Sequence, residues 1–130
     1  MDTLFPVEIK TRTASHVLEV ELALTKEQQE RGLMHRKTLA DRSGMLFQFE
    51  QVAPARIWMK NTYVSLDLIF ISDGGQIVSI VHSARPDCEQ MHWSDGYVRA
   101  LLEVSAGLAK TLGIQPGDSV TYDKHLFPTA

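Results

Sequence analysis

The sequence has 130 residues, 44% of them hydrophobic and 22% charged, with a formal net charge of −3 when the histidines are neutral. These values are typical of one globular domain, which we expect over residues 1–130 with its core at about residues 7–122, and they argue against disorder. The negative balance argues against a nucleic-acid partner, since phosphate binding depends on clustered Lys and Arg, and no apolar run approaches the ~20 residues of a membrane-spanning helix.

Two segments of alternating apolar and charged residues open the chain, at Val7–Thr11 and Leu18–Leu22. This alternation predicts an antiparallel hairpin with one buried face. Next, Thr25 is a good N-cap with Gln28 three residues later, as in a capping box, and Gly32 is a typical stop signal. The sequence therefore predicts a hairpin followed by a short polar helix on the surface.

The middle of the sequence contains a run of predicted strands, at Gly44–Phe49, Ala55–Lys60, Leu66–Ile71 and Gln76–His82. The third of these is apolar at every position but one, which is typical of a central strand that is covered on both faces. The Asp73–Gly75 segment before the fourth strand favours a tight hairpin, because glycine readily adopts a positive φ.

The polar stretch Ser83–Gly96 predicts a long loop, and loops of this length are commonly functional or mobile. A strand at Val98–Ser105, a short helix at Gly107–Gly113 and a last strand at Ser119–Tyr122 follow. About eight mostly antiparallel strands and two short helices predict a mainly β fold, either a β-sandwich or a closed barrel.

Several motifs in this order also carry a family resemblance. They are Arg31–Arg36, Gly44–Phe49, Trp58–Thr62, Leu66–Ile71, Gly75–Ile77, Leu102–Gly107 and Gly113–Val120. From about Val7 to Tyr122 the chain resembles the bacterial and archaeal family called domain of unknown function 192. The Trp-Met-Lys-Asn-Thr string and the Leu-Asp strand after it are the most specific part. The resemblance implies a small, mainly β domain and offers no catalytic residues to carry over.

Relatives in this family often carry an export signal or a lipid anchor ahead of the domain, and some have a cysteine pair in the region matching Pro86–Tyr97. This sequence has the single cysteine Cys88 there, so no internal disulfide is expected. Its first residues lack a basic segment and a long apolar stretch, so we expect no export signal within it. A periplasmic location is therefore implied by the resemblance alone.

The Trp58–Thr62 segment is the first candidate site. Trp58 and Lys60 share one face by alternation, with Asn61 beside them. A large aromatic ring near a cation and an amide is a common composition of contact surfaces. In the structural alternative, Trp58 belongs to the core, and Asn61 and Thr62 hydrogen-bond the backbone of a turn.

Two acidic residues, Asp67 and Glu103, lie within apolar strands. A buried unpaired carboxylate is costly, so each residue needs a partner or a raised pKa. Candidate cations are Lys60, Arg31, Arg36 and Arg99. Two neighbouring carboxylates could serve acid–base chemistry. Alternatively, both are structural and bind the backbone or a cation.

Zinc-type ligands occur at His82, Cys88 and His92, but their spacing matches no established site, so we expect neither a metal nor a cofactor. The leading hypothesis is a non-enzymatic ligand-binding or accessory module for an unknown small molecule or protein. Its contact surface would comprise Trp58, Lys60, Asn61 and Asp67, with Arg31, Arg36 and Glu103 nearby. The alternatives are an enzyme that uses Asp67 or Glu103 with Lys60, and an assembly module sealed by Met34, Trp58 and Phe127.

Overall fold

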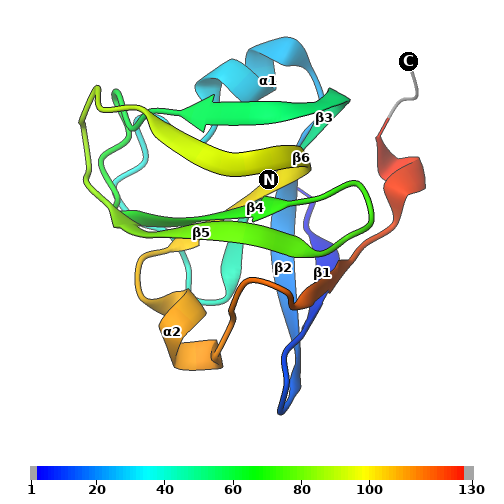
Figure 1. Cartoon of the computed structure of the whole chain (residues 1–130). Coiled ribbons are helices and arrows are strands. Elements are labelled where there is room, and N and C mark those ends of the chain that lie inside the picture. The colour runs from blue at the N-terminus through cyan, green and yellow to red at the C-terminus, as the bar shows by residue number, and fades with distance from the viewer. Residues whose placement is uncertain (1–2, 128–130) are drawn as a thin grey trace.

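A computed structural model describes residues 3–127, which form one sheet with the strand order β5-β4-β6-β3-β2-β1-β7. The strands are β1 Phe5–Lys10, β2 Ser15–Ala23, β3 Ser43–Ile57, β4 Leu66–Ile71, β5 Ile77–Ala84, β6 His92–Ser105 and β7 Ser119–Thr121. The helices are α1 Lys26–Arg31, α2 Leu108–Leu112 and the 3₁₀ helix η1 Lys124–Leu126. The helices α1 and α2 lie at opposite ends of the sheet (Figure 1).

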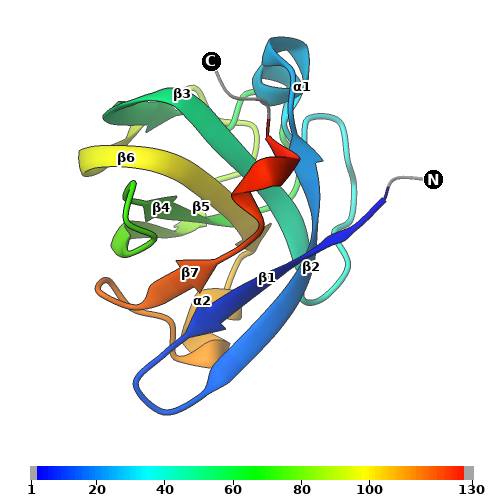
Figure 2. The ribbon, with the colours of Figure 1, turned by 90° about the vertical axis from the view of Figure 1, so that its right-hand side faces the viewer.

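The sheet curls into a half-barrel (Figure 2), so the fold is mainly β as predicted, but the predicted β-sandwich or closed barrel is wrong. The edge strands β5 and β7 meet only in an isolated bridge between Gln76 and Ser119. With three residues, β7 is too short to pair along the eight residues of β5. The curl therefore brings the two edges together at one end and leaves them unpaired along the rest.

Two expectations about the middle of the chain need correction. The predicted strands at 44–49 and 55–60 are a single strand, β3, whose register against β6 breaks between Gln48 and Ala53. The predicted loop at 83–96 shrinks to residues 85–91, because β6 already begins at His92. Asp95, with φ +59, interrupts the alternation of apolar residues in this part of β6, which hides the strand from sequence patterns.

The hairpin and both short helices follow their sequence signals. β1 pairs antiparallel with β2, and α1 begins at Thr25 with the predicted capping box. The side-chain amide of Gln29 donates to the carbonyl oxygens of Ala23 and Gln48, at 3.2 and 2.9 Å, and so ties α1 to β2 and β3. This tie holds the end of α1 against the sheet. Within residues 3–127, no helix is long and apolar enough to cross a membrane.

Apolar residues cover both faces of the sheet. The inner cluster fills the inside of the curl with α2 and includes Val7, Ile9, Leu18, Val20, Leu46, Ile69, Ile71, Leu102, Val104 and Leu108. The outer cluster packs the other face against the segments around α1 and includes Leu33, Met45, Phe47, Met59, Leu66, Leu68, Phe70 and Leu101. Alternate residues of β4 enter the two clusters, and all six are buried, which confirms the predicted central strand.

Candidate functional site

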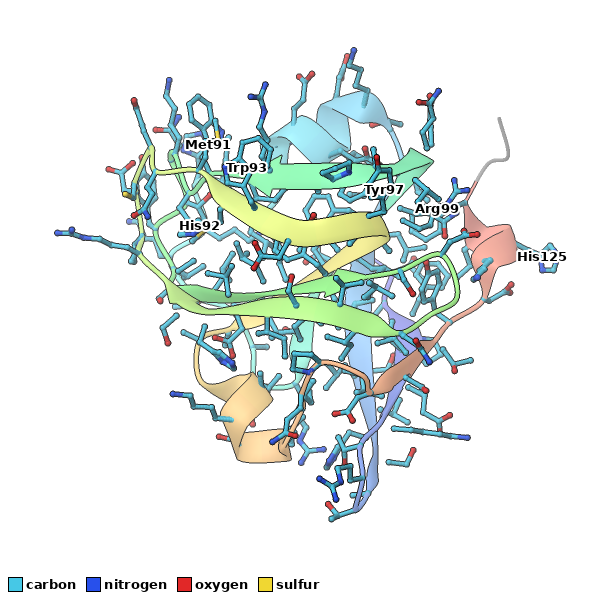
Figure 3. The ribbon with its side chains drawn as sticks, in the orientation of Figure 1. Met91, His92, Trp93, Tyr97, Arg99 and His125 are labelled. Carbon is cyan, nitrogen blue, oxygen red and sulfur yellow. The ribbon has the colours of Figure 1, made fainter. Side chains whose placement is uncertain are left out.

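A pocket of about 210 Å³ lies over the outer cluster, between the end of α1 and the strands β3 and β6. We call it the Glu103 pocket. Its lining includes Glu30, Arg31, Gly32 and Met34 from α1 and the following segment, Phe47, Phe49 and Arg56 from β3, Leu101 and Glu103 from β6, and Trp58, Thr62 and Met91 from the neighbouring loops. Trp58 and Met91 are 38% and 39% exposed, so they stand where the pocket opens to solvent. Figure 3 shows Met91 next to Trp93 at the end of β6 that faces α1.

Glu103 is the buried acid of this pocket, with 6% of its surface exposed. The strand register places it directly opposite Met45 of β3 and Leu68 of β4, both of which are apolar. A Cβ placed on Gly32 would lie 3.7 Å from Oε1 of Glu103, so the carboxyl reaches the backbone at the end of α1. No group in residues 3–127 donates a hydrogen bond to this carboxyl or forms an ion pair with it.

Burial raises the pKa of Glu103 from 4.5 to about 8, because the ionised form loses its hydration. At neutral pH most molecules therefore hold the proton, and the carboxyl can both donate and accept a hydrogen bond. The other charged residues lining the pocket, Glu30, Arg31 and Arg56, are exposed. The pocket thus combines a desolvated acid with apolar walls and a charged, solvated opening.

The Trp58–Thr62 segment follows β3 as a turn and not as part of the strand. Its backbone holds two loops together: the N–H of Met59 donates to the carbonyl of Cys88 at 3.0 Å, and the N–H of His35 donates to the carbonyl of Asn61 at 2.8 Å. The N–H of Asn61 donates to Oδ1 of Asp87 at 3.1 Å. These bonds favour the structural interpretation for Asn61.

Trp58 remains partly exposed, and Nζ of Lys60 lies 5.2 Å from its ring centroid. Met59, between these two residues, is buried. Trp58 lines the Glu103 pocket, whereas Lys60 is not part of the lining and stacks on the ring. Trp58 thus belongs to both the turn and the pocket.

Asp67 is fully buried, but on the other face of the sheet. It pairs with Val104, a residue of the inner cluster, while Glu103 pairs with Leu68 of the outer cluster. Directly opposite residues of neighbouring strands share a face, so Asp67 and Glu103 point to opposite faces. The two acids therefore do not share one cleft.

The carboxylate of Asp67 is also fully used within the fold. It accepts hydrogen bonds from the backbone N–H groups of Ser83, Gly107 and Ala109, at 2.8, 3.1 and 3.0 Å. These bonds join β5 and the start of α2 to β4. The structural alternative for Asp67, an acid bound to the backbone, is the one that the geometry supports.

Arg36 lies outside the Glu103 pocket. Its guanidinium group binds the carboxylate of Glu21 through both terminal nitrogens, with Nη2 at 2.7 Å from Oε1. This pair lines a second, wider cavity of about 480 Å³ on the other side of Arg31, Gly32 and Met34. Of the seven predicted contact residues, Trp58, Arg31 and Glu103 therefore lie together in one pocket, and the others do not.

Two further expectations concern the interface residue Phe127 and a metal site. Phe127 is 4% exposed and packs edge-on against Tyr122, with ring centroids 6.1 Å apart, so it does not seal an interface with Trp58 as the assembly hypothesis required. In the part of the chain that the structure describes, no three His, Cys, Asp or Glu side chains are grouped to hold a metal ion.

Several pocket residues escaped the sequence analysis as site residues, among them Phe49, Arg56 and Met91. Phe49 ends the predicted strand Gly44–Phe49, which is the one signal that the sequence offered. Arg56 lies in the second half of β3, and Met91 lies in the loop before β6. The bounds of this strand and of this loop were predicted wrongly. Their proximity depends on the pairing of β3 with β6, which sequence patterns do not reveal.

The fold and the pocket define a small β domain with a half-barrel sheet and one buried acid beneath its outer surface. The family model DUF192, described as "Uncharacterized ACR", matches residues 7–122, so the chain belongs to this family and the resemblance drawn from its motifs is confirmed.

Two crystal structures are similar to it over nearly their whole length. A "putative transcription regulator" from Sinorhizobium meliloti 1021 is 40% identical, with a TM-score of 0.89 over 93% of this chain and 95% of that one. A protein of unknown function from Novosphingobium aromaticivorans is 38% identical, with a TM-score of 0.89 over 92% and 85% of the two chains. Among curated proteins, none matches the chain.

Proposed function

We propose that this chain is a non-enzymatic binding module that accepts a small organic ligand in the Glu103 pocket. One observation carries the proposal: Glu103, a residue with 6% of its surface exposed, lines this pocket, and its carboxyl has no hydrogen-bond or ion-pair partner among residues 3–127. Burying a polar group without a hydrogen bond costs about 1–3 kcal/mol in proteins. A ligand that supplies the missing partner would recover this free energy.

The size and lining of the pocket support a compact ligand. Its volume of about 210 Å³ is below the roughly 300–1,000 Å³ of sites for drug-sized molecules. Phe47, Phe49 and Trp58 supply apolar and aromatic walls, and Glu103 supplies one orienting polar group. A few polar groups among apolar walls are the usual composition of a small-molecule site.

The enzymatic alternative has less support. The acid–base hypothesis needs Asp67 or Glu103 to act with Lys60 on a common substrate. Asp67 is held by three backbone amides on the inner face, and Lys60 does not line the pocket that contains Glu103. A single carboxyl is left, and it is better suited to orienting a ligand than to a reaction that needs a second group.

A thermal-shift panel of small amines, amides, alcohols and carboxylic acids tests the proposal. We expect at least one class to raise the melting temperature of the wild type and to lose this effect in Glu103→Gln. Glu50→Gln is the matched control, because Glu50 is exposed and does not line the pocket. Hits that persist unchanged in Glu103→Gln, or a panel without hits, would count against the proposal.

We further propose that the partner is not a nucleic acid. The description of the S. meliloti relative concerns that protein, whereas this chain has a formal net charge of −3, and nucleic-acid binding relies on a positive surface. An electrophoretic mobility-shift assay with duplex DNA at low salt should show no complex. A salt-dependent shift would contradict this prediction.

A further inference from the structure

We infer that the ligand of the Glu103 pocket carries an organic ammonium group, which pairs with the Glu103 carboxylate while the rest of the molecule contacts the aromatic walls. This inference rests on the proposed function and narrows it to one class of ligand. It is carried by the buried unpartnered carboxyl and by the aromatic residues that line the pocket with it.

The first argument concerns the partner that the carboxyl lacks. Met45 and Leu68, its neighbours across the sheet, are apolar and offer no donor. An ammonium group offers three donors and a compensating charge, and hydrogen bonds between ions are roughly twice as strong as those between neutral groups. An anionic ligand would repel the ionised carboxyl, and a neutral ligand, which can pair with the protonated acid, would leave the negative charge uncompensated once the acid ionises.

The second argument concerns the walls of the pocket. Phe47, Phe49 and Trp58 line the pocket together with Glu103, and aromatic faces attract cations through their quadrupoles. The ring of Trp58 already attracts one cation of the chain itself, Lys60, whose Nζ lies 5.2 Å from the centroid. A buried acid among aromatic rings is a chemically consistent receptor for an ammonium ion.

The other charges near the pocket are compatible with a cation. Arg31 on α1 and Arg56 on β3 are positive, and Glu30 on α1 is negative, and all three are exposed. Exposed charges are screened by salt over about 10 Å. The guanidinium of Arg56 also lies over the ring of Trp93, with 5.9 Å between its carbon and the centroid. Glu103 is thus the one buried charge that a ligand in the pocket meets among the described residues.

Binding of an ammonium ion is coupled to release of a proton. Burial raises the pKa of Glu103 to about 8, so the free pocket holds the neutral acid at pH 7. An ammonium ion that binds the carboxylate displaces this proton to the solvent, and charge is conserved because one cation replaces another. The affinity should therefore rise with pH, about tenfold per unit between pH 6 and 7, and level off above pH 8. A neutral ligand bound to the acid form would instead weaken above pH 8.

Isothermal titration calorimetry with benzylamine and with its uncharged counterpart benzyl alcohol tests this inference. Wild type should bind the amine more tightly than the alcohol at pH 8. At pH 7 it should release a proton on binding the amine, which appears as a dependence of the binding enthalpy on the ionisation enthalpy of the buffer. Glu103→Gln should bind both probes equally and without a pH dependence. Glu50→Gln, which removes a charge of the same sign from an exposed residue outside the pocket, should keep both the preference and the proton release.

The outcomes separate the inference from the proposed function. If benzyl alcohol or another neutral compound binds as well as benzylamine, with binding lost in Glu103→Gln, the ammonium inference is overturned while the binding function stands. If no compound of the panel binds, both are overturned. Nα-acetyl-lysine amide carries a free ε-ammonium group. If it binds more tightly than benzylamine, this result would support the inference and point to a protein lysine as the source of the ammonium group.

Discussion

The substitution Glu103→Gln should remove the loss of stability that ionisation of Glu103 causes in the wild type between pH 5 and 9. Glutamine keeps the shape of the side chain and cannot ionise. In the wild type the pKa of Glu103 is raised by burial to about 8, against 4.5 for the group in water. Between these values the folded state holds a proton that the unfolded chain has released, so raising the pH favours unfolding.

The size of the effect follows from the interval between the two pKa values. Each pH unit in it corresponds to about 1.4 kcal/mol, and the interval spans roughly 3.5 units, so ionisation of Glu103 should cost the folded wild type on the order of 5 kcal/mol by pH 9. Little of this cost is removed by solvent, since 6% of the residue is exposed. The stabilising effect of the protonated state is complete below about pH 4.5 and is lost as the pH rises through about 8.

Urea unfolding of wild type, Glu103→Gln and the surface control Glu50→Gln at pH 5, 6, 7, 8 and 9 measures this effect. The difference in unfolding free energy between Glu103→Gln and wild type should grow with pH in favour of the variant and reach its plateau near pH 9. The constant part of this difference, which reflects the unpaired amide of glutamine, does not affect the slope. Parallel stability curves for wild type and Glu103→Gln would refute the argument that this carboxyl is desolvated and unpaired.

Three further substitutions probe other parts of the structure. Asp67→Asn should lower the free energy of unfolding by about 2–4 kcal/mol in urea titrations. The asparagine NH2 group that replaces one carboxylate oxygen cannot accept from the three backbone amides that bind the carboxylate. A loss under about 1 kcal/mol would contradict this. Trp58→Ala should weaken binding of a pocket ligand about fivefold in calorimetry, while Trp93→Ala, outside the pocket, should leave it unchanged. Tyr122→Phe should cost about 1 kcal/mol through the loss of its hydrogen bond to Gln48, 2.8 Å long. This cost should be constant from pH 6 to 9, because burial raises the pKa of Tyr122 to about 12; a cost that varies with pH would refute it.

Local signals in the sequence predicted the elements of the fold well, because those elements are stabilised by neighbouring residues. The capping box at Thr25 and the alternation in β1 and β2 act over a few positions, and the structure follows them. Strand order and closure are different. Whether the edges β5 and β7 pair along their length depends on the three-residue length of β7, and a short strand at the end of a chain carries no sequence signal for what it pairs with.

The candidate site was predicted in part for the same reason. Composition singled out Trp58 and the two acids within apolar strands, but it could not tell which face each acid occupies. That assignment depends on the register of β4 against β6, in which Asp67 pairs with Val104 and Glu103 with Leu68. A shift of one residue along a strand exchanges its faces, so the contents of the pocket become visible only once the pairing is known.

The comparison of the two buried acids gives the strongest reason to assign a function to one of them. Asp67 is surrounded by three backbone donors, so its burial stabilises the junction of β4, β5 and α2, and the fold alone explains it. Glu103 is nearly as deeply buried, yet no group in residues 3–127 hydrogen-bonds to its carboxyl, so above neutral pH it lowers the stability of the domain. An apolar side chain at this position of β6 would pack against Met45 and Leu68 without that cost. Stability does not explain the acid at this position, whereas recognition of a ligand that reaches it through the pocket does.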